Sequence, residues 1–515
     1  MVEAVRSVVI VGGGTAGWLT AGIIAARHQA RIKAGRFCVT LVESPGIPII
    51  GVGEGTWPTM RSTLERIGVS ETALFRQCDA AFKQGGKFTG WTTGAANDAY
   101  YHPLMYPQGF SQVNLVPHWL RAGDGRSFCD FVTPQGRLCD DGLAPKQITN
   151  AEYQGPANYA YHLDAGKFAP FLSQHCIDKL GVRHVLADIT EVKQRECGDI
   201  ESVLTRQAGS IAGDLFVDCS GFSALLLGKT LGVPFKSCSD VLFCDTALAV
   251  QVPFATPDAP LASQTNATAH EAGWTWDICL PTRRGVGYVY SSRHTSEEAA
   301  RETLLRYIGA EHKDLPVRKI PIRAGHREIF WKNNCVAIGL ASGFLEPLES
   351  SAIVLVELSA KLLAEQMPAC REVMDIVARR FNEVTMYRFG RIVDFLKLHY
   401  VLTQRTDTAF WRDNVDPAGV PERLRDLLTL WKYQSPWFFD ELDRLEEVFP
   451  AASYQYVLYG MGFRTEVAPE DTVETAVAAA RLVQENERAT GEMRARLPRN
   501  RELLNKIYQY GLQPI

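Results

Sequence analysis

The stretch SVVIVGGGTAGWLTAGIIAAR, residues 7–27, decides the fold. Its first five residues are apolar and β-branched after Ser7, as in a buried strand, whereas residues 15–27 have the Ala, Leu and Ile content of a helix. Between them, Gly12, Gly14 and Gly17 fit the pattern G-x-G-x-x-G in the strand–turn–helix context of a dinucleotide-binding turn. The first glycine permits the tight turn, the second lets backbone approach a pyrophosphate, and the third lets helix and strand pack closely.

The residues that follow extend this interpretation. The helix start at Thr15 and Ala16 offers amides and a partial positive charge to phosphates. A second apolar run, 37–42, ends at Glu43, whose carboxylate is placed to hydrogen-bond a ribose hydroxyl. A merely structural turn is the alternative. The run 334–339 repeats the pattern of a strand ending in glycine, where a flavoprotein would bring the backbone at Gly339 and Leu340 against FAD; a single fingerprint disfavours a second fold for NAD(P)H.

The rest of the chain divides by texture. Short apolar runs predict further strands over 202–206, 215–217, 247–252, 287–291 and 334–339. Apolar residues at three- and four-residue spacing predict helices over 353–366, 371–402 and 472–496. We therefore predict an α/β fold: an FAD-binding, doubly wound module over 1–365 with a loop-rich insertion at about 91–150, and a helical C-terminal region over 366–515.

Composition excludes several classes of function. Lys and Arg number 54 against 58 Asp and Glu, so there is no basic excess and a nucleic-acid partner is not expected. The apolar run 8–26 is interrupted by glycines and no processing site follows it, so we expect neither a membrane span nor a signal peptide, and a cytoplasmic location. The 12 cysteines form no C-x-x-C pair, which predicts reduced, mostly buried thiols and no metal site.

Three further motifs carry a resemblance. Residues 274–278 read WTWDI, residues 344–350 read FLEPLES, and Phe82 and Lys83 precede the segment GKF and Trp91. With the glycine fingerprint, these motifs resemble those of the flavin-dependent halogenases, most closely the tryptophan halogenase branch, over nearly the whole chain. The resemblance implies the FAD-binding fold of the flavin monooxygenases, with the helical C-terminal region covering the substrate.

The chemistry that the resemblance implies is specific. Reduced FAD, supplied by a separate flavin reductase, reacts with O₂ and a halide ion, bromide or chloride, to give hypohalous acid. This oxidant passes through an internal tunnel to the catalytic Lys83, which either hydrogen-bonds it as an ammonium or forms a haloamine as an amine. The expected substrate is an electron-rich aromatic, free indole or an indole derivative, and a homodimer is left open.

Other roles follow from the same motifs. Glu349 matches a catalytic glutamate whose carboxylate orients the oxidant or takes a proton from the ring intermediate. Ser350 matches a serine between the flavin and lysine sites, and the resemblance places it and Ile353 on the cofactor. The amides of Ser351 and Ala352 match a halide-binding backbone. Trp274 and Trp276 would wall the flavin from the substrate.

The sequence also departs from the family pattern. The proline of W-x-W-x-I-P is Cys279, and the glycine of F-x-x-P-x-x-S-x-G is Ala352. The segment at His102 resembles the family's substrate clamp, but Leu104 stands where an aromatic residue usually does, which removes one stacking face. We therefore expect His102 and Leu104 to contact the substrate, and tryptophan itself is in doubt.

Plainer interpretations stay open. Lys83 could be a solvated lysine on one helical face with Lys87, and Glu349 a helix-start acid that complements the dipole. His102 could be an ordinary loop histidine. For the whole chain, the alternatives are a flavin-dependent aromatic hydroxylase, in which oxygen goes directly to the ring, and a non-catalytic flavin-binding protein.

Overall fold

A computed structural model describes residues 4–47, 53–95, 97–438, 447–468 and 472–515. Its first layer is a six-stranded sheet in the order β20 (Trp331–Lys332), β21 (Cys335–Ala337), β12 (Leu215–Asp218), β1 (Ser7–Val11), β2 (Cys38–Glu43) and β8 (Arg183–Leu186). All neighbours are parallel except β20 and β21. The fingerprint strand β1 is therefore central and lies between β12 and β2, as a doubly wound module requires.

Helices cover this sheet because its strands are apolar on both faces. Helix α1 (Thr15–Arg27) packs between α10 (Ser351–Glu365) and α8 (Ala165–Leu180). An antiparallel sheet of β9 (Ile189–Gln194), β10 (Ile200–Thr205) and β11 (Gly209–Ala212) extends beside it. The predicted strand–turn–helix unit and the α/β class are confirmed, and the carboxyl ends of β1 and β2 open at one edge of the sheet.

A second layer lies beyond that edge. It is a seven-stranded sheet in the order β18 (Arg318–Pro321), β14 (Thr246–Pro253), β17 (Arg283–Tyr290), β16 (Gly273–Cys279), β15 (Thr265–His270), β5 (Gly85–Thr89) and β6 (Ala99–Pro103). A small sheet of β3 (Gly53–Gly55), β7 (Ala160–Asp164) and β4 (Ala81–Lys83) bridges the two layers. Short connecting elements complete this half: α2 (Gln29–Lys33), α3 (Thr59–Ile67), α4 (Glu71–Cys78), α9 (Glu297–Ile308), β13 (Phe235–Ser237), β19 (Gly325–Arg327) and β22 (Gly343–Phe344).

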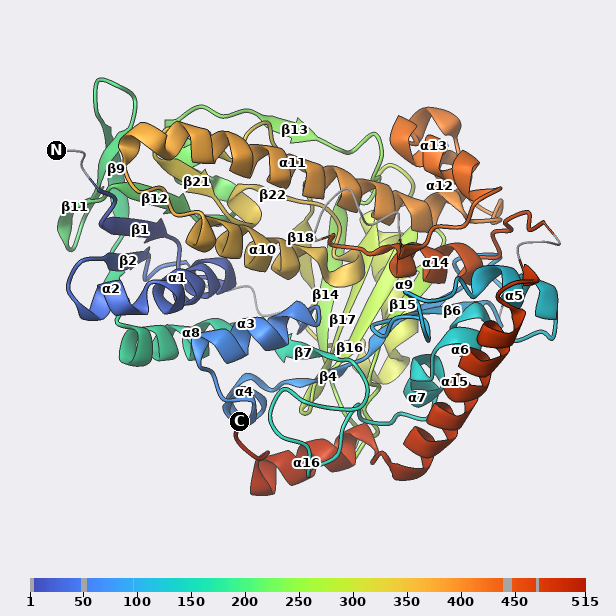
Figure 1. Cartoon of the computed structure of the whole chain (residues 1–515). Helices are drawn as coiled ribbons and strands as arrows, with labels where there is room; N and C mark the ends of the chain where they lie inside the picture. Colours follow the sequence, from blue (N-terminus) through green and yellow to red (C-terminus); the bar gives the residue numbers. More distant parts are fainter. Residues whose placement is uncertain (1–3, 48–52, 96, 439–446, 469–471) are drawn as a thin grey trace.

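The last third is helical, as predicted. Helix α11 (Arg371–Val401) has 31 residues, about 46 Å, and runs along the upper side of the molecule above α10 (Figure 1). The remaining helices are α12 (Ala409–Asn414), α13 (Glu422–Trp431), α14 (Ala451–Gly460), α15 (Ala476–Arg496) and α16 (Asn500–Tyr510). Buried residues before and after the predicted boundary at 365/366 share one hydrophobic core, so the division into two regions stays a prediction.

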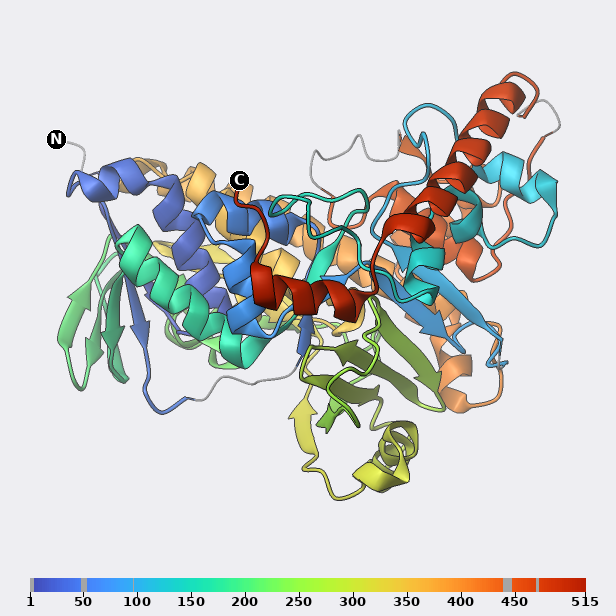
Figure 2. The ribbon, with the colours of Figure 1, turned by 90° about the horizontal axis from the view of Figure 1, so that it is seen from below.

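The insertion predicted at 91–150 holds more regular structure than its weak periodicity indicates. It contains β6 and the short helices α5 (Val116–Ala122), α6 (Phe128–Val132) and α7 (Gln135–Asp140). Each helix has seven residues or fewer, too short for a 3.6-residue pattern to stand out. Figure 2 places helix α15, beside this insertion, and strands β9–β11 at opposite ends of the molecule.

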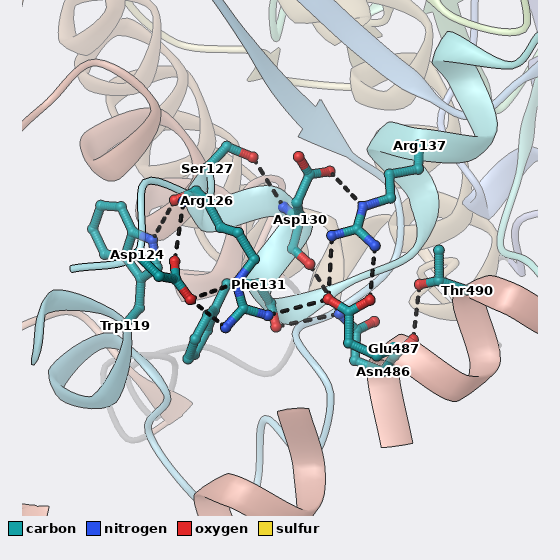
Figure 3. Close-up of polar contacts among 10 residues, drawn as sticks. All are labelled: Trp119, Asp124, Arg126, Ser127, Asp130, Phe131, Arg137, Asn486, Glu487 and Thr490. Carbon is teal, nitrogen blue, oxygen red and sulfur yellow. Dashed lines mark hydrogen bonds and ion pairs between the residues drawn. The ribbon is translucent and has the colours of Figure 1, made fainter. Parts of the chain in front are cut away.

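Polar contacts fasten α15 to the insertion (Figure 3). The Glu487 carboxylate accepts hydrogen bonds from Arg126 and Arg137, with the shortest at 2.8 Å from Arg137 Nη1. The buried Asn486 side chain donates to the backbone oxygens of Asp130 and Phe131. These oxygens lie in the last turn of α6, where helical acceptors lack partners of their own.

Candidate active site

One cavity of about 670 Å³ connects the two layers. At one end it is lined by the glycine turn after β1 and by Glu43, and at the other by Lys83, His102 and Glu349. Every residue that the sequence assigned to cofactor, halide, substrate or catalysis lines it, apart from Gly17, which packs behind the turn. The structure thus brings together residues that lie up to 341 positions apart, from Gly12 to Ile353.

The glycine turn has the geometry that its sequence predicts. Gly12 has a φ of 117°, and a Cβ there would lie 2.2 Å from the Cys219 oxygen. A Cβ at Gly17 would lie 1.9 Å from the Gly12 oxygen, so both glycines permit close approach of backbone. A Cβ at Gly14 would meet nothing within 4 Å, and this open space lies at the N-terminus of α1. An anionic phosphate fits there.

Other predicted cofactor residues surround this end. Glu43 ends β2 and lies 3.1 Å from His184 Nε2. Gly339 has a φ of 75°, and a Cβ there would lie 2.6 Å from the Ala16 side chain, which brings this second glycine loop against the first. The remaining predicted contacts also line the cavity: Thr15, Ala16, Leu340, Ser350 and Ile353. Backbone-lined space, a helix N-terminus and one carboxylate fit an FAD.

Lys83 ends strand β4 and points into the cavity. Its side chain is 4% exposed, and Nζ donates to the Thr56 oxygen at 3.1 Å and to Ser350 Oγ at 2.9 Å. Burial lowers the pKa of Lys83 to about 8, against the opposing effect of the Glu349 charge. The alternative that Lys83 is a solvated lysine sharing a helical face with Lys87 is therefore wrong. Lys87 lies on strand β5 and pairs with Asp140.

Glu349 lies in a turn immediately before α10. Glu349 and Ser350 are both left-handed, with φ values of 61° and 54°, which for non-glycine residues costs about 1–3 kcal/mol each. This backbone turns the carboxylate toward two buried histidines. His102 Nδ1 lies 2.8 Å from Glu349 Oε1, and His399 Nε2 lies 3.3 Å from the same atom.

The histidines set the charge of Glu349. Burial alone would raise the pKa of Glu349, but the charge and hydrogen bond of His102, and then the neighbouring His399, hold this pKa well below its usual range. His102 lies on strand β6, so the ordinary loop histidine is wrong; its Nε2 pairs with Ser453 Oγ at 2.9 Å. Leu104 follows β6, where its amide donates to Gln135.

Two pairs of residues complete the cavity wall. Trp274 and Trp276 are buried neighbours on β16, and the ring of Trp276 covers Gly287, where a Cβ would lie 2.1 Å from it. Ser351 and Ala352 are the first residues of α10, where N–H groups lack acceptors within the helix and carry partial positive charge. Such amides can hold an anion in the cavity.

Sequence reasoning missed four residues of this site. His399 lies in the last turn of α11, where it belongs to an apolar pattern, and its Nδ1 pairs with the hydroxyl of Tyr100 at 2.7 Å. Trp57 donates a hydrogen bond from Nε1 to the backbone oxygen of Glu349 at 2.7 Å. Gly55 leaves room for Ser350 and Lys83, since a Cβ there would lie 2.6 Å from Ser350 Oγ and 3.2 Å from Lys83 Nζ. None has a local signal, because its partners come from distant segments.

Comparison with known proteins decides the family. The sequence matches the tryptophan halogenase family over residues 7–477. The chain belongs to the tryptophan halogenases. The crystal structure of a tryptophan halogenase from Shewanella frigidimarina superimposes with a TM-score of 0.96 at 46% identity, covering 100% of this chain and 99% of that one. The tryptophan 6-halogenase SttH from Streptomyces toxytricini is 37% identical over 482 residues, 88% of this chain and 89% of SttH.

The match extends to the solved structure of a flavin-dependent halogenase. BrvH, a flavin-dependent halogenase from Brevundimonas sp. BAL3, superimposes with a TM-score of 0.86 at 34% identity, covering 98% of this chain and 99% of BrvH. The predicted family, the FAD-binding fold with its helical C-terminal region, and the enzyme class are therefore confirmed.

Two features are absent from the ranges that the structure describes. Across the described ranges, no helix combines the length and apolar character needed to cross a membrane. Those same ranges contain no group of three or more Cys, His, Asp or Glu side chains arranged to bind a metal.

Proposed function

We propose that this tryptophan halogenase halogenates the indole ring of tryptophan with bromide or chloride, using O₂ and reduced FAD from a separate flavin reductase. The observation that carries the proposal is the pairing, in one cavity, of a glycine turn that fits FAD with a buried lysine beside a buried, ionised glutamate. The sequence left open free indole or an indole derivative, and relatives named for tryptophan support tryptophan, an indole derivative, over free indole.

The bound flavin would supply hypohalous acid from O₂ and halide. At the far end of the cavity, the Lys83 ammonium already donates to Thr56 and Ser350, and its third N–H can donate to the oxygen of the oxidant. As the halogen bonds to a ring carbon, the halogen–oxygen bond breaks and a Lys83 proton converts the departing hydroxide to water.

Glu349 then acts on the ring. The carboxylate stabilises the cationic ring and takes the proton from the halogenated carbon, which restores the aromatic system. His102 and His399 hold the carboxylate in place. We assign His102 and Leu104, which line the cavity, to substrate contact, and the Ser351 and Ala352 amides at the start of α10 to the halide ion.

A mass-spectrometric assay tests the proposal. The enzyme is supplied with reductase-reduced FAD, air and either bromide or chloride, with tryptophan and indole offered in parallel. We expect halogenated tryptophan in the parent and none in Lys83→Ala. A product heavier by one oxygen and indifferent to halide would instead identify a hydroxylase, and halogenation of indole alone would overturn the substrate.

A further inference from the structure

The ring of Trp57 lies beside the two proposed catalytic residues. Trp57 is 8% exposed and lines the cavity, and Lys83 Nζ lies over its ring, 6.0 Å from the ring centroid. The hydrogen bond from Trp57 Nε1 to the backbone oxygen of Glu349 fixes the orientation of the indole plane. The rings of His102, at 5.7 Å, and Phe449, at 5.4 Å, also pack against it.

The separation of Lys83 and Trp57 suits a reaction between an oxidant held by Lys83 and the ring of Trp57. A hydrogen bond from Nζ to an oxidant spans about 2.8 Å. A reacting atom comes within about 3–3.5 Å of the atom that it attacks. These two lengths and the halogen–oxygen bond between them add up to more than the 6.0 Å that separates Nζ from the ring centroid, so the oxidant fits between them in a bent arrangement, over the ring face from which an electrophile attacks an aromatic carbon.

The ring is also of the right chemical class. Indole is the group that this family halogenates in its substrate, and Trp57 carries the same indole within the protein. Among the described residues, Trp57 is the aromatic side chain over which Lys83 lies. An oxidant that waits at Lys83 in the absence of substrate therefore faces a reactive ring of the enzyme itself.

We propose that Trp57 is an internal halogenation site, modified by hypohalous acid held at Lys83 when no aromatic substrate occupies the cavity; this inference rests on the proposed function. The halogen–oxygen bond breaks as a carbon–halogen bond forms on the indole. The ring carbon loses its proton to Glu349, and the departing hydroxide becomes water with a proton from Lys83. The added halogen narrows the cavity between Lys83 and Glu349, so each modification inactivates one enzyme molecule.

Peptide mass spectrometry tests the inference on the full-length enzyme. Trypsin releases the peptide 37–61, in which Trp57 is the single tryptophan and no tyrosine or histidine is present. The enzyme is incubated with reductase-reduced FAD, air and bromide, with and without saturating tryptophan. We expect one bromine on this peptide without tryptophan, at least tenfold less with tryptophan, and none in Lys83→Ala or Trp57→Phe.

The outcomes separate the two proposals. Bromotryptophan in the tube with substrate, together with an unmodified Trp57 in the tube without it, overturns the inference and leaves the proposed function standing. Bromine on the peptide that contains Trp274 and Trp276 instead of on 37–61 also overturns it. Absence of any bromide-dependent product overturns the proposed function, and the inference with it.

A second measurement follows the consequence. We expect the parent to lose tryptophan bromination during preincubation with reduced FAD, air and bromide, and to keep it when bromide is omitted. Trp57→Phe should lose its tryptophan-bromination activity, relative to its own starting value, at least threefold more slowly than the parent. The reason is that a benzene ring is less reactive than an indole toward electrophiles. Equal rates of loss would show that Trp57 is not the site of inactivation.

Discussion

The two ends of the cavity differ in what lines them, which is backbone at one end and charged side chains at the other. The proposed flavin end is formed by backbone at Gly12, Gly14 and Gly339, where close approach of backbone and a helix N-terminus would bind the cofactor. The oxidant end is formed by side chains, with Lys83 and Glu349 contributed by separate elements. A backbone site depends on space and shape, whereas a side-chain site depends on charge, and substitutions should therefore affect the two ends differently.

Removing the lysine should have the largest effect and should leave the flavin end intact. We expect Lys83→Ala to lower the rate of tryptophan halogenation by about 10³-fold or more, because no other lysine among the described residues lines the cavity. The FAD dissociation constant, measured by flavin fluorescence, should change less than twofold. Lys87→Ala, on the neighbouring strand, is the matched control and should keep full activity. Weakened FAD binding in Lys83→Ala would show that the ends are not independent.

Removing the charge of Glu349 should come next. We expect Glu349→Gln to lower the halogenation rate by about 10²-fold, because a neutral amide neither stabilises the cationic ring nor accepts its proton. Glu349→Asp keeps the charge but shortens its reach to His102 and should fall between the parent and Glu349→Gln. A rate in Glu349→Gln within threefold of the parent would exclude a role for this carboxylate in the reaction.

The two ends of the cavity also differ in how far the sequence predicts them. The glycine turn is local: Gly12 to Gly17 and the following helix carry their meaning within a few residues, so the fold and the flavin end could be predicted. Lys83 and Glu349 were found through short motifs. His399 and Trp57 were not, because their contacts with Glu349 exist only after α11 and the segment beyond β3 fold together.

The pH dependence of halogenation should report the oxidant end. The pKa of Lys83 is about 8, and the proposed step uses its ammonium form, which predominates below that pH. With saturating reduced FAD, we expect the rate to be constant below about pH 8 and to fall above it, approaching tenfold per pH unit. A rate that rises through pH 8 would instead indicate that the neutral amine forms a haloamine. FAD affinity should not follow this profile.

Two glycines should separate space for the fold from space for the cofactor. In Gly17→Ala the new Cβ would clash with the Gly12 backbone, so we expect unfolding to become easier by about 1–3 kcal/mol. In Gly14→Ala the Cβ meets no protein atom, so stability without FAD should be unchanged while FAD binds about tenfold more weakly. Thermal unfolding with and without FAD measures both. Equal destabilisation by the two substitutions would contradict the assignment of Gly14 to the cofactor.

The smallest effects should come from the contacts of α15, which touch neither end. We expect Glu487→Gln to lower the free energy of unfolding by less than about 1 kcal/mol, because its ion pairs are partly exposed. Asn486→Ala should lower it by about 1–3 kcal/mol, because two backbone oxygens lose a buried donor. Denaturant unfolding checks the order. Halogenation by both variants should stay within twofold of the parent, and a larger loss would extend the oxidant end to α15.

The start of helix α10 joins the two ends in a way that matters for protein engineering. The left-handed pair Glu349 and Ser350 leads directly into the amides of Ser351 and Ala352, so the proposed proton acceptor and the proposed halide site lie within four consecutive residues at the start of one helix. A substitution that tilts this turn moves both at once. On the proposed roles, halide preference and the position of halogenation on the ring change together. A library that varies residues 349–352 would therefore select both properties at once.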